Sequence, residues 1–354
     1  MSVPEHQRRL VVLAAERNIP LDVSIELTHH CNFRCQHCYI PDFSAPDLLS
    51  TERLLTLLEE LAEIGTLFLT LTGGELFLRR DWLTVARRAR ELGFALRLFS
   101  NGALIDDAVA DAVAGLSCAV EISLYSMDEA TFETLTRRPG SFAKTLQGVE
   151  RLRARGVEVL LKVPMTTRNY RDIDAVAAYA EEVGAGFQVS PTIMAKKNGD
   201  PATLALRVPQ QDLLPHYGGP HLGCHIPEED PTDPRRDGPL CAAANRYCNI
   251  TSSGDVMACN ILPGSDGNVR ERSFRDVWEN SPWLNQVRAI RRDNLHTCKT
   301  CSRLPYCGRC HAQALVEDGD LYGPSSYAQE RAEIFESLAG RSGERPDVAP
   351  ARDP

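Results

Sequence analysis

Between residues 21 and 190, short apolar runs alternate with longer segments whose apolar residues recur at helical spacing. The apolar runs are short enough for buried strands, and the segments between them are typical of amphipathic helices. The predicted strands are residues 23–27, 67–71, 95–99, 119–124, 157–163 and 187–189.

Gly93, Gly156 and Gly184 each stand between a helical segment and the next strand, where a glycine commonly ends a helix. Six such repeats with right-handed crossovers predict an α/β fold with a parallel sheet, either open or curled into a partial (β/α)6 barrel. In both arrangements the active site lies at the carboxyl ends of the strands.

The alternation stops near residue 195. We expect an N-terminal extension at 1–20, the barrel at 21–195, and a connecting segment at 196–240 with a short helix at 210–214. Residues 241–325 are rich in cysteine and predict a small domain held by metal rather than by a large core. Residues 326–354 predict a helix followed by a polar, proline-rich tail, which we expect to be disordered.

Composition limits the class of protein. The chain has 354 residues, 43% of them hydrophobic, and a formal charge of −9, which fits a globular protein of about two domains. The negative charge argues against nucleic acid as the main partner. No run of about 18 apolar residues occurs, and charged residues interrupt the N-terminal stretch where a signal peptide would lie. We therefore expect a cytoplasmic protein that does not enter a membrane.

The twelve cysteines are unevenly distributed. All except Cys118 fall within residues 31–38 and 224–310. A cytosolic chain of this size uses such cysteines for metal binding or catalysis more often than for disulfides. Cys118 lies in an apolar run and is predicted to be a buried strand residue.

Cys31, Cys35 and Cys38 directly follow the first predicted strand. Three thiolates are one too few for a closed zinc site, which normally takes four ligands. A four-iron cluster held by three cysteines leaves one iron open to a small molecule. The spacing therefore predicts a cluster that binds its substrate directly, in the first loop of the catalytic face.

Gly73, Gly74 and Glu75 follow the second predicted strand. Glycines at a strand end let the backbone approach a ligand closely. A glycine turn followed by an acidic helix cap would explain the triplet equally well on its own. Its position next to the three-cysteine loop favours ligand binding.

Together, Cys-x3-Cys-x2-Cys and Gly-Gly-Glu resemble the radical S-adenosylmethionine superfamily. The resemblance implies that Cys31, Cys35 and Cys38 hold a [4Fe–4S] cluster whose fourth iron is chelated by S-adenosylmethionine. Its reductive cleavage would give a 5′-deoxyadenosyl radical that takes hydrogen from a substrate. The residues implied to contact S-adenosylmethionine are Gly73, Gly74 and Glu75 at its amino group, His37 near adenine, and Ser100, Asn101 and Ser123 at its ribose and carboxylate.

The C-terminal cysteines form a second pattern, which fits zinc as readily as iron–sulfur on chemistry alone. Beside such a core it is similar to the SPASM domain, which carries auxiliary [4Fe–4S] clusters. The ligands implied are Cys241, Cys259 and Cys310 for the first cluster, with Cys248 or Cys224 completing it, and Cys298, Cys301 and Cys307 for the second.

The chain departs from that pattern in two places. Only Gly308 and Arg309 separate Cys307 from Cys310, where the family often has three residues. No cysteine follows Cys310, although the family usually has a final one. The second auxiliary cluster is therefore open to substrate, ligated by another side chain, or absent.

The resemblance implies an enzyme that abstracts hydrogen from a ribosomally made peptide and oxidises or crosslinks it. The alternatives are an oxidase of a tetrapyrrole or other small molecule, and a zinc-stabilised binding protein without turnover. Sulfatase maturases have an aspartate base where this chain has Asn260, which counts against that activity.

Two partners are expected besides the substrate. Only about twenty residues precede the first strand, so leader recognition is assigned to a separate small protein, as in pyrroloquinoline quinone biosynthesis. A flavodoxin- or ferredoxin-like protein is the expected reductant. Lys196 and Lys197 could contact an acidic leader, but a solvated loop is the simpler interpretation of that run.

Overall fold

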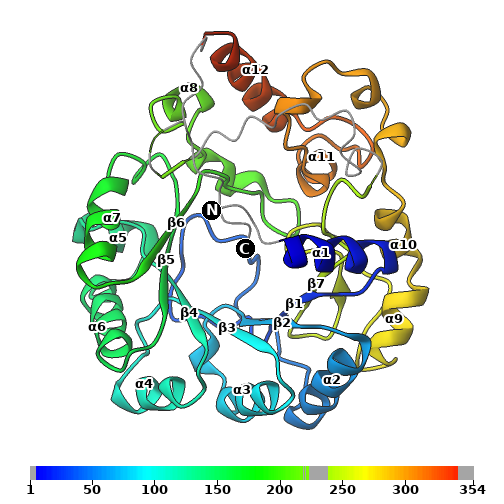
Figure 1. Cartoon of the computed structure of the whole chain (residues 1–354). Helices are drawn as coiled ribbons and strands as arrows, with labels where there is room; N and C mark the ends of the chain where they lie inside the picture. The colour runs from blue at the N-terminus through cyan, green and yellow to red at the C-terminus, as the bar shows by residue number, and fades with distance from the viewer. Residues whose placement is uncertain (1–4, 218, 220, 223–237, 342–354) are drawn as a thin grey trace.

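The computed structural model describes residues 5–217, 219, 221–222 and 238–341 (Figure 1). The predicted α/β fold is confirmed, and each predicted strand forms within two residues of its expected start. The first six strands are β1 (Asp22–Glu26), β2 (Phe68–Thr72), β3 (Ala95–Ser100), β4 (Ala119–Ser123), β5 (Val159–Pro164) and β6 (Gly186–Ser190).

The strands form one curved sheet in the order β6-β5-β4-β3-β2-β1-β7-β8 within the described residues. Strands β1 to β6 pair in parallel with their sequence neighbours. Strand β7 (Tyr247–Ile250) pairs in parallel with β1, and β8 (Val256–Met257) pairs antiparallel with β7. The cysteine-rich region thus extends the barrel sheet, which the sequence pattern did not predict.

Helices cover the outer side of the sheet (Figure 1). In α2, Ser50 accepts a hydrogen bond from the Arg53 amide at the N-terminus, and Gly65 ends the helix in the left-handed conformation. The α-helices are α1 (Glu5–Arg17), α2 (Thr51–Ile64), α3 (Trp82–Glu91), α4 (Asp107–Ala114), α5 (Glu129–Thr136), α6 (Ser141–Ala154), α7 (Ile173–Glu182), α8 (Gln210–Leu213), α9 (Phe274–Asn280), α10 (Pro282–Arg288), α11 (His311–Val316) and α12 (Ser326–Arg341). Among the described residues, the 3-10 helices are η1 (Leu76–Leu78), η2 (Pro201–Leu206), η4 (Arg292–Asn294), η5 (Cys298–Thr300) and η6 (Leu304–Tyr306).

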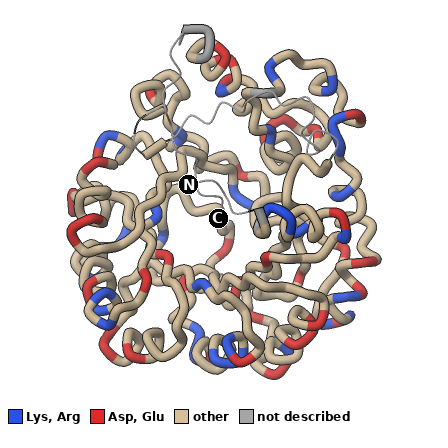
Figure 2. The backbone as a smooth tube through the Cα atoms, in the orientation of Figure 1, with Lys and Arg blue, Asp and Glu red and all other residues tan. Residues whose placement is uncertain are grey.

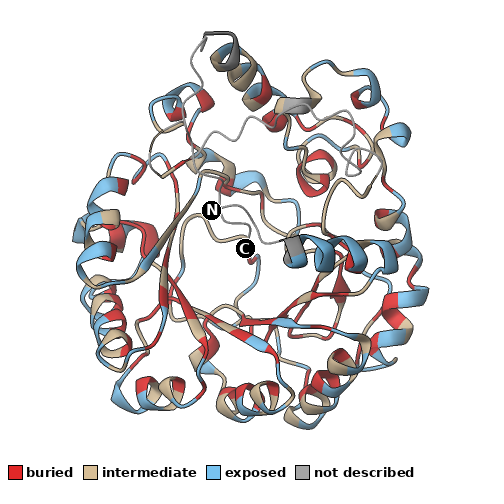
Figure 3. Ribbon diagram, in the orientation of Figure 1, coloured by how far each residue is buried: buried red, intermediate tan, exposed pale blue. Residues whose placement is uncertain are grey.

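Most strand residues of the sheet are buried (Figure 3), and in β1 the two faces differ in polarity. In β1, Val23 and Ile25 belong to the hydrophobic core, whereas Ser24 and Glu26 alternate with them. Because successive strand side chains point to opposite faces, Glu26 lies on the inner, concave face. The core therefore fills the layer between sheet and helices, and polar side chains line the inner face.

The first part of the cysteine-rich region shares the barrel's core. Phe274, Val277 and Trp278 of α9 are buried in the same hydrophobic cluster as β1. The Phe274 amide donates to Glu60 of α2 at 2.6 Å, and the Trp278 indole donates to the Asn18 carbonyl at 2.6 Å. This packing joins the first part of the region to the barrel's core, and the metal expected to hold the region stays a prediction.

Two smaller expectations can be compared with the structure. The short helix predicted at 210–214 is α8, and Cys118 is buried in the core as predicted. Among the described helices, none combines the length and apolar character needed to cross a bilayer.

Candidate active site

The loop between β1 and α2 (residues 27–50), here called the cysteine loop, carries Cys31, Cys35 and Cys38, all half-buried. The Phe33 amide donates to Cys31 Sγ at 3.3 Å, a contact of the kind that tunes iron–sulfur clusters. Burial raises the pKa of Cys31 to about 11, and the neighbouring Cys38 also raises it. The pKa of Cys35 is raised as well, first by burial and then by Cys38. The structure thus brings the three thiols together.

Gly73 and Gly74 bring the end of β2 against the cysteine loop. The Gly74 amide donates to the Thr28 carbonyl at 2.7 Å, and the Glu75 amide donates to the His30 carbonyl at 2.8 Å. A Cβ on Gly74 would lie 2.4 Å from the His30 carbonyl oxygen, and one on Gly73 would lie 2.3 Å from that of Thr28. Only glycine permits this close approach. Gly73 and Gly74 therefore position the cysteine loop, in addition to any contact that they make with a ligand.

Glu75 connects β2, β3 and the cysteine loop. Its fully buried carboxylate accepts hydrogen bonds from Ser100 Oγ at 2.9 Å and from the Asn101 amide at 2.8 Å. The Asn101 side chain donates to Asn32 Oδ1 at 2.7 Å, beside Cys31. Burial raises the pKa of Glu75, and these donors partly offset the increase. Within the described residues, no cationic side chain hydrogen-bonds or pairs with this carboxylate, so an ammonium group would complement it.

His37 and Ser123 meet at Tyr125, which the sequence interpretation did not include. The rings of His37 and Tyr125 lie 4.8 Å apart edge to face, and the Tyr125 hydroxyl lies 3.6 Å from Cys35 Sγ. Ser123 hydrogen-bonds that hydroxyl. Burial lowers the pKa of His37 to about 4, and its buried Nδ1 has no hydrogen-bond partner within the described residues. Tyr125 lies in the loop after β4, and no sequence motif marked it as a site residue.

Cys241, Cys259 and Cys310 come together although they are distant in sequence. Burial raises the pKa of Cys259 to about 12, and Cys241 and Cys310 are close enough to raise it further. Backbone amides point at two of the sulfurs: Leu262 donates to Cys259 at 3.2 Å, and Ala243 donates to Cys241 at 3.5 Å. The grouping agrees with the ligand set expected for the first auxiliary cluster.

Cys248 lies elsewhere. It is on β7 opposite Val23 of β1, fully buried in the hydrophobic core between sheet and helices. Its neighbour Asn249 points the other way and donates to Glu26 at 3.2 Å on the inner face. This geometry makes Cys248 a core residue rather than the ligand that was expected. Cys224 lies outside the described residues.

Cys298, Cys301 and Cys307 form the second group. Burial raises the pKa of Cys307, and Cys298 and Cys301 add to the increase. Where a further cysteine was expected, the segment after Asp320 is held by Arg309, which donates to the carbonyls of Leu321 at 2.5 Å and Gly323 at 2.7 Å. The cationic side chain of Arg309 therefore lies beside the segment in which the family's final cysteine was expected.

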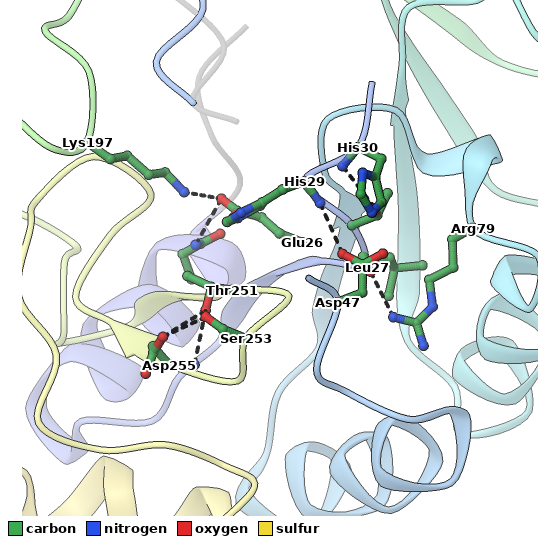
Figure 4. Close-up of polar contacts among 12 residues, drawn as sticks. Glu26, Leu27, His29, His30, Asp47, Arg79, Lys197, Thr251, Ser253 and Asp255 are labelled. Carbon is green, nitrogen blue, oxygen red and sulfur yellow. Dashed lines mark hydrogen bonds and ion pairs between the residues drawn. The ribbon is translucent and has the colours of Figure 1, made fainter. Parts of the chain in front are cut away.

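Two contacts connect the cysteine loop to distant segments. The hydroxyl of the half-buried Tyr39, one residue after Cys38, hydrogen-bonds Asn260, one residue after Cys259. Arg79 donates to the Leu27 carbonyl at 2.8 Å (Figure 4). It also donates to the Leu49 carbonyl at 2.7 Å. The first contact brings two predicted cluster-binding regions together, and the second fixes both ends of the loop.

A polar cluster lies on the inner face beside this loop (Figure 4). Glu26, 1% exposed, accepts hydrogen bonds from Lys197, His29 and Asn249. Burial favours a raised pKa, but Lys197 and His29 outweigh it, so the pKa of Glu26 is lowered. The Lys197 side chain is only 10% exposed, so the solvated-loop interpretation of Lys197 was wrong.

The donor sets fit iron–sulfur clusters better than a single ion. Within the described part of the chain, no three His, Cys, Asp or Glu side chains converge where one metal ion would be held. A cluster spreads its thiolate ligands over several irons, so three neighbouring thiols need not converge on one point. Amide donors directed at Cys31, Cys241 and Cys259 suit thiolates held in that way.

Two family profiles match separate parts of the chain. The profile of the radical SAM superfamily matches residues 25–180, from β1 to α7. The profile of the SPASM iron–sulfur cluster-binding domain matches residues 241–302.

Several characterised enzymes are similar to this chain over most of its length. It is 26% identical to the AdoMet-dependent heme synthase of Methanosarcina barkeri, over 89% of this chain and 98% of that protein. It is 28% identical to the mycofactocin maturase MftC of Mycobacterium ulcerans, over 86% of each. It is 27% identical to the PqqA peptide cyclase of Xanthomonas campestris pv. campestris, over 85% of this chain and 84% of that one.

Solved structures share the fold. SuiB of Streptococcus suis bound to its precursor peptide SuiA aligns with a TM-score of 0.72 at 20% identity, over 92% of this chain and 80% of SuiB. Native anSMEcpe with bound AdoMet aligns with a TM-score of 0.65 at 17% identity, over 91% of this chain and 98% of that one. At this identity the likeness concerns the fold alone.

Proposed function

Because the chain belongs to the radical SAM superfamily and carries a SPASM domain, we propose that it abstracts hydrogen from a ribosomally made peptide and oxidises or crosslinks the product. The observation that carries the proposal is the network in which Glu75, Asn101 and the three-cysteine loop meet at the carboxyl ends of β1 to β3. That position is where parallel barrels hold their active sites.

In this proposal Cys31, Cys35 and Cys38 hold the [4Fe–4S] cluster. When bound, the cluster supplies the electron that cleaves S-adenosylmethionine into methionine and a 5′-deoxyadenosyl radical. Glu75 binds the amino group of S-adenosylmethionine, since its buried carboxylate is held in place by Ser100 and the Asn101 amide. The barrel around these groups excludes water from the reacting atoms.

The auxiliary ligands are proposed in two sets. Cys241, Cys259 and Cys310 hold the first auxiliary cluster, and Cys298, Cys301 and Cys307 contribute to the second. These clusters supply an acceptor for the electron that the substrate loses on oxidation. The hydrogen bond between Tyr39 and Asn260 supports this arrangement, because it ties the first auxiliary site to the cysteine loop.

A peptide substrate is supported by relatives named as a maturase and a peptide cyclase. We assign leader recognition to a separate small protein and electron supply to a flavodoxin- or ferredoxin-like reductant. Because the leader-recognition protein and the reductant would both be soluble proteins, we place the enzyme in the cytoplasm. The second candidate is oxidation of a tetrapyrrole, supported by the heme synthase that aligns over 98% of its own length.

The test is anaerobic reconstitution followed by assay of 5′-deoxyadenosine after adding dithionite and S-adenosylmethionine. We expect the wild type to cleave S-adenosylmethionine and the Cys31/Cys35/Cys38→Ala triple variant to lose all cleavage. The Cys118→Ala variant is the matched control, because Cys118 is buried away from the three thiols.

Substrate class is decided in the same assay. Synthetic precursor peptides encoded beside the gene are added, and loss of two hydrogen masses or a crosslink is sought by mass spectrometry. Turnover of a haem precursor without any peptide would favour the second candidate. No cleavage by a protein with a fully loaded first cluster would refute both.

A further inference from the structure

The loop after β4 brings a tyrosine hydroxyl to the cysteine loop. Tyr125 Oη lies 3.6 Å from Cys35 Sγ, although 90 positions separate the two residues in the chain. Cys31, by contrast, accepts a hydrogen bond from the backbone amide of Phe33. A backbone amide is present whatever the side chain, whereas the hydroxyl at Cys35 depends on the residue type at position 125.

The direction of the hydrogen bond between Tyr125 and Cys35 follows from its chemistry. A cysteine binds a metal as the thiolate, which has no proton to donate. The Tyr125 hydroxyl is therefore the donor, and its proton is committed to Cys35. Ser123, at the end of β4, also hydrogen-bonds this hydroxyl, so Ser123 donates to the Tyr125 oxygen. The two hydroxyls thus form a chain of hydrogen bonds that leads from β4 to the cysteine loop.

Packing holds the Tyr125 ring in this position. Tyr125 is 5% exposed, and its ring centroid lies 4.8 Å from that of His37 and 5.4 Å from that of Phe132. Its backbone carbonyl accepts a hydrogen bond from the Asn169 side chain at 2.7 Å. The hydroxyl is therefore held towards Cys35, and away from water the hydrogen bond is stronger than it would be at the surface.

Charged side chains do not distinguish the surroundings of Cys35. Lys, Arg, Asp and Glu residues are spread over the outer helices (Figure 2). Burial raises the pKa of Cys35, and the side chains that shift it most after burial are Cys38, Tyr125 and Cys31. The reduction potential of an iron–sulfur cluster depends on charge, exposure and hydrogen bonds to its sulfurs. At Cys35 the hydrogen bond is supplied by Tyr125.

We propose that Tyr125, acting through Cys35, raises the reduction potential of the cluster at Cys31, Cys35 and Cys38, and that Ser123 orients the Tyr125 hydroxyl. The proposal rests on the proposed function, because only there do these three thiols hold a cluster. Reduction adds negative charge to a cluster and its thiolates. A donor directed at Cys35 therefore stabilises the reduced form more than the oxidised form.

The test replaces Tyr125 by Phe, which keeps the ring and removes only the hydroxyl. The holoenzyme is reconstituted anaerobically and its iron is counted. A redox titration monitored by electron paramagnetic resonance, without S-adenosylmethionine, then gives the midpoint potential of the first cluster. Its signal is the one lost in the triple-alanine variant of the three cysteines. Tyr327→Phe is the matched control, because Tyr327 is also 5% exposed and its hydroxyl donates to the Pro191 carbonyl.

We expect Tyr125→Phe to keep the wild-type iron content and to have an equilibrium constant for reduction about tenfold lower, which is a shift of about 59 mV to lower potential for one electron. Ser123→Ala should shift the potential in the same direction by a smaller amount, and Tyr327→Phe should not shift it. A potential of Tyr125→Phe equal to that of the control would overturn the proposal. If Tyr125→Phe does not load the first cluster, Ser123→Ala decides, and a potential equal to the control's in that variant would overturn it.

Failure of the proposed function gives a different result. A wild type that holds the first cluster but cleaves no S-adenosylmethionine would refute the proposed function, while the measured potentials still decide the role of Tyr125. Normal cleavage with an unshifted potential would refute only the role of Tyr125. A wild type that binds no iron at the three cysteines would refute both.

Discussion

Lys197 and Glu26 form an ion pair on the inner face of the barrel although 171 positions separate them in the chain. Lys197 reaches Glu26 from the segment after β6, whereas Glu26 ends β1 (Figure 4). The pair therefore joins the two ends of the parallel strand series, which do not pair with each other in the sheet.

Replacing Lys197 by Met should destabilise the protein by about 3–5 kcal/mol, because it leaves a buried carboxylate without its cation. Denaturant unfolding measures the change. The neighbouring Lys196→Met is the control, since its partly exposed pair with Asp200 should be worth at most about 1 kcal/mol. A Glu26→Gln/Lys197→Met double variant should recover much of the loss, and equal costs for the two single lysine variants would contradict the burial argument.

Glu26 should also make stability depend on pH. Lys197 and His29 lower its folded-state pKa below the ordinary value of 4.5 despite burial. The stabilisation is therefore fully present above 4.5 and is lost as the pH falls through the lowered folded-state pKa. We expect the stability gap between wild type and Glu26→Gln to narrow between about pH 7 and about pH 3. A gap of constant size in unfolding experiments at both pH values would show that Glu26 does not titrate in this way.

Gly74→Ala should prevent the cysteine loop from adopting its position. The new Cβ would lie 2.4 Å from the His30 carbonyl oxygen and 2.5 Å from that of His29, and the His30 carbonyl already accepts a hydrogen bond from the Glu75 amide at 2.8 Å. We expect the variant to bind about four irons fewer per chain after reconstitution, because one [4Fe–4S] site is lost. Gly115→Ala is the control, since its Cβ would make only ordinary contacts from 3.5 Å; equal iron contents in the two variants would count against the close-approach argument.

Cys310→Ala and Cys248→Ala should differ in iron content. Cys310 is grouped with Cys241 and Cys259, so its loss should remove about four irons per chain. Cys248 lies in the core opposite Val23, so its loss should leave iron unchanged and reduce stability only modestly. Iron and sulfide analysis of both proteins decides the point, and a loss of iron from Cys248→Ala would restore it as a ligand.

Much of the barrel could be predicted because its signals are local. Apolar runs bounded by helical segments placed β1 to β6, and the spacing of Cys31, Cys35 and Cys38 placed the first site after β1. Strand β7 escaped prediction because Tyr247–Ile250 is only four residues long and includes Asn249. Strand β7 pairs with β1, which lies far from it in the sequence. No local pattern encodes such a long-range contact.

The same distinction separates the site residues. Glu75 and the three cysteines could be predicted from the sequence, because they lie in the segments that directly follow β2 and β1. Tyr125, Lys197 and the contact between Tyr39 and Asn260 could not, because each acquires its role from a partner far along the chain. Cys248 was misassigned for the opposite reason: its residue type suggested a ligand, but strand alternation turned its side chain into the core.

By itself the sequence determined the fold class, since short-range periodicity specifies strands, helices and loops, and its motifs predicted the resemblance to the family and the cysteines of the first site. Only the tertiary structure decided which cysteines meet, which face Glu26 and Cys248 occupy, and that the Tyr125 hydroxyl reaches Cys35. Those properties depend on burial and on distances between remote segments, and both exist only once the chain has folded.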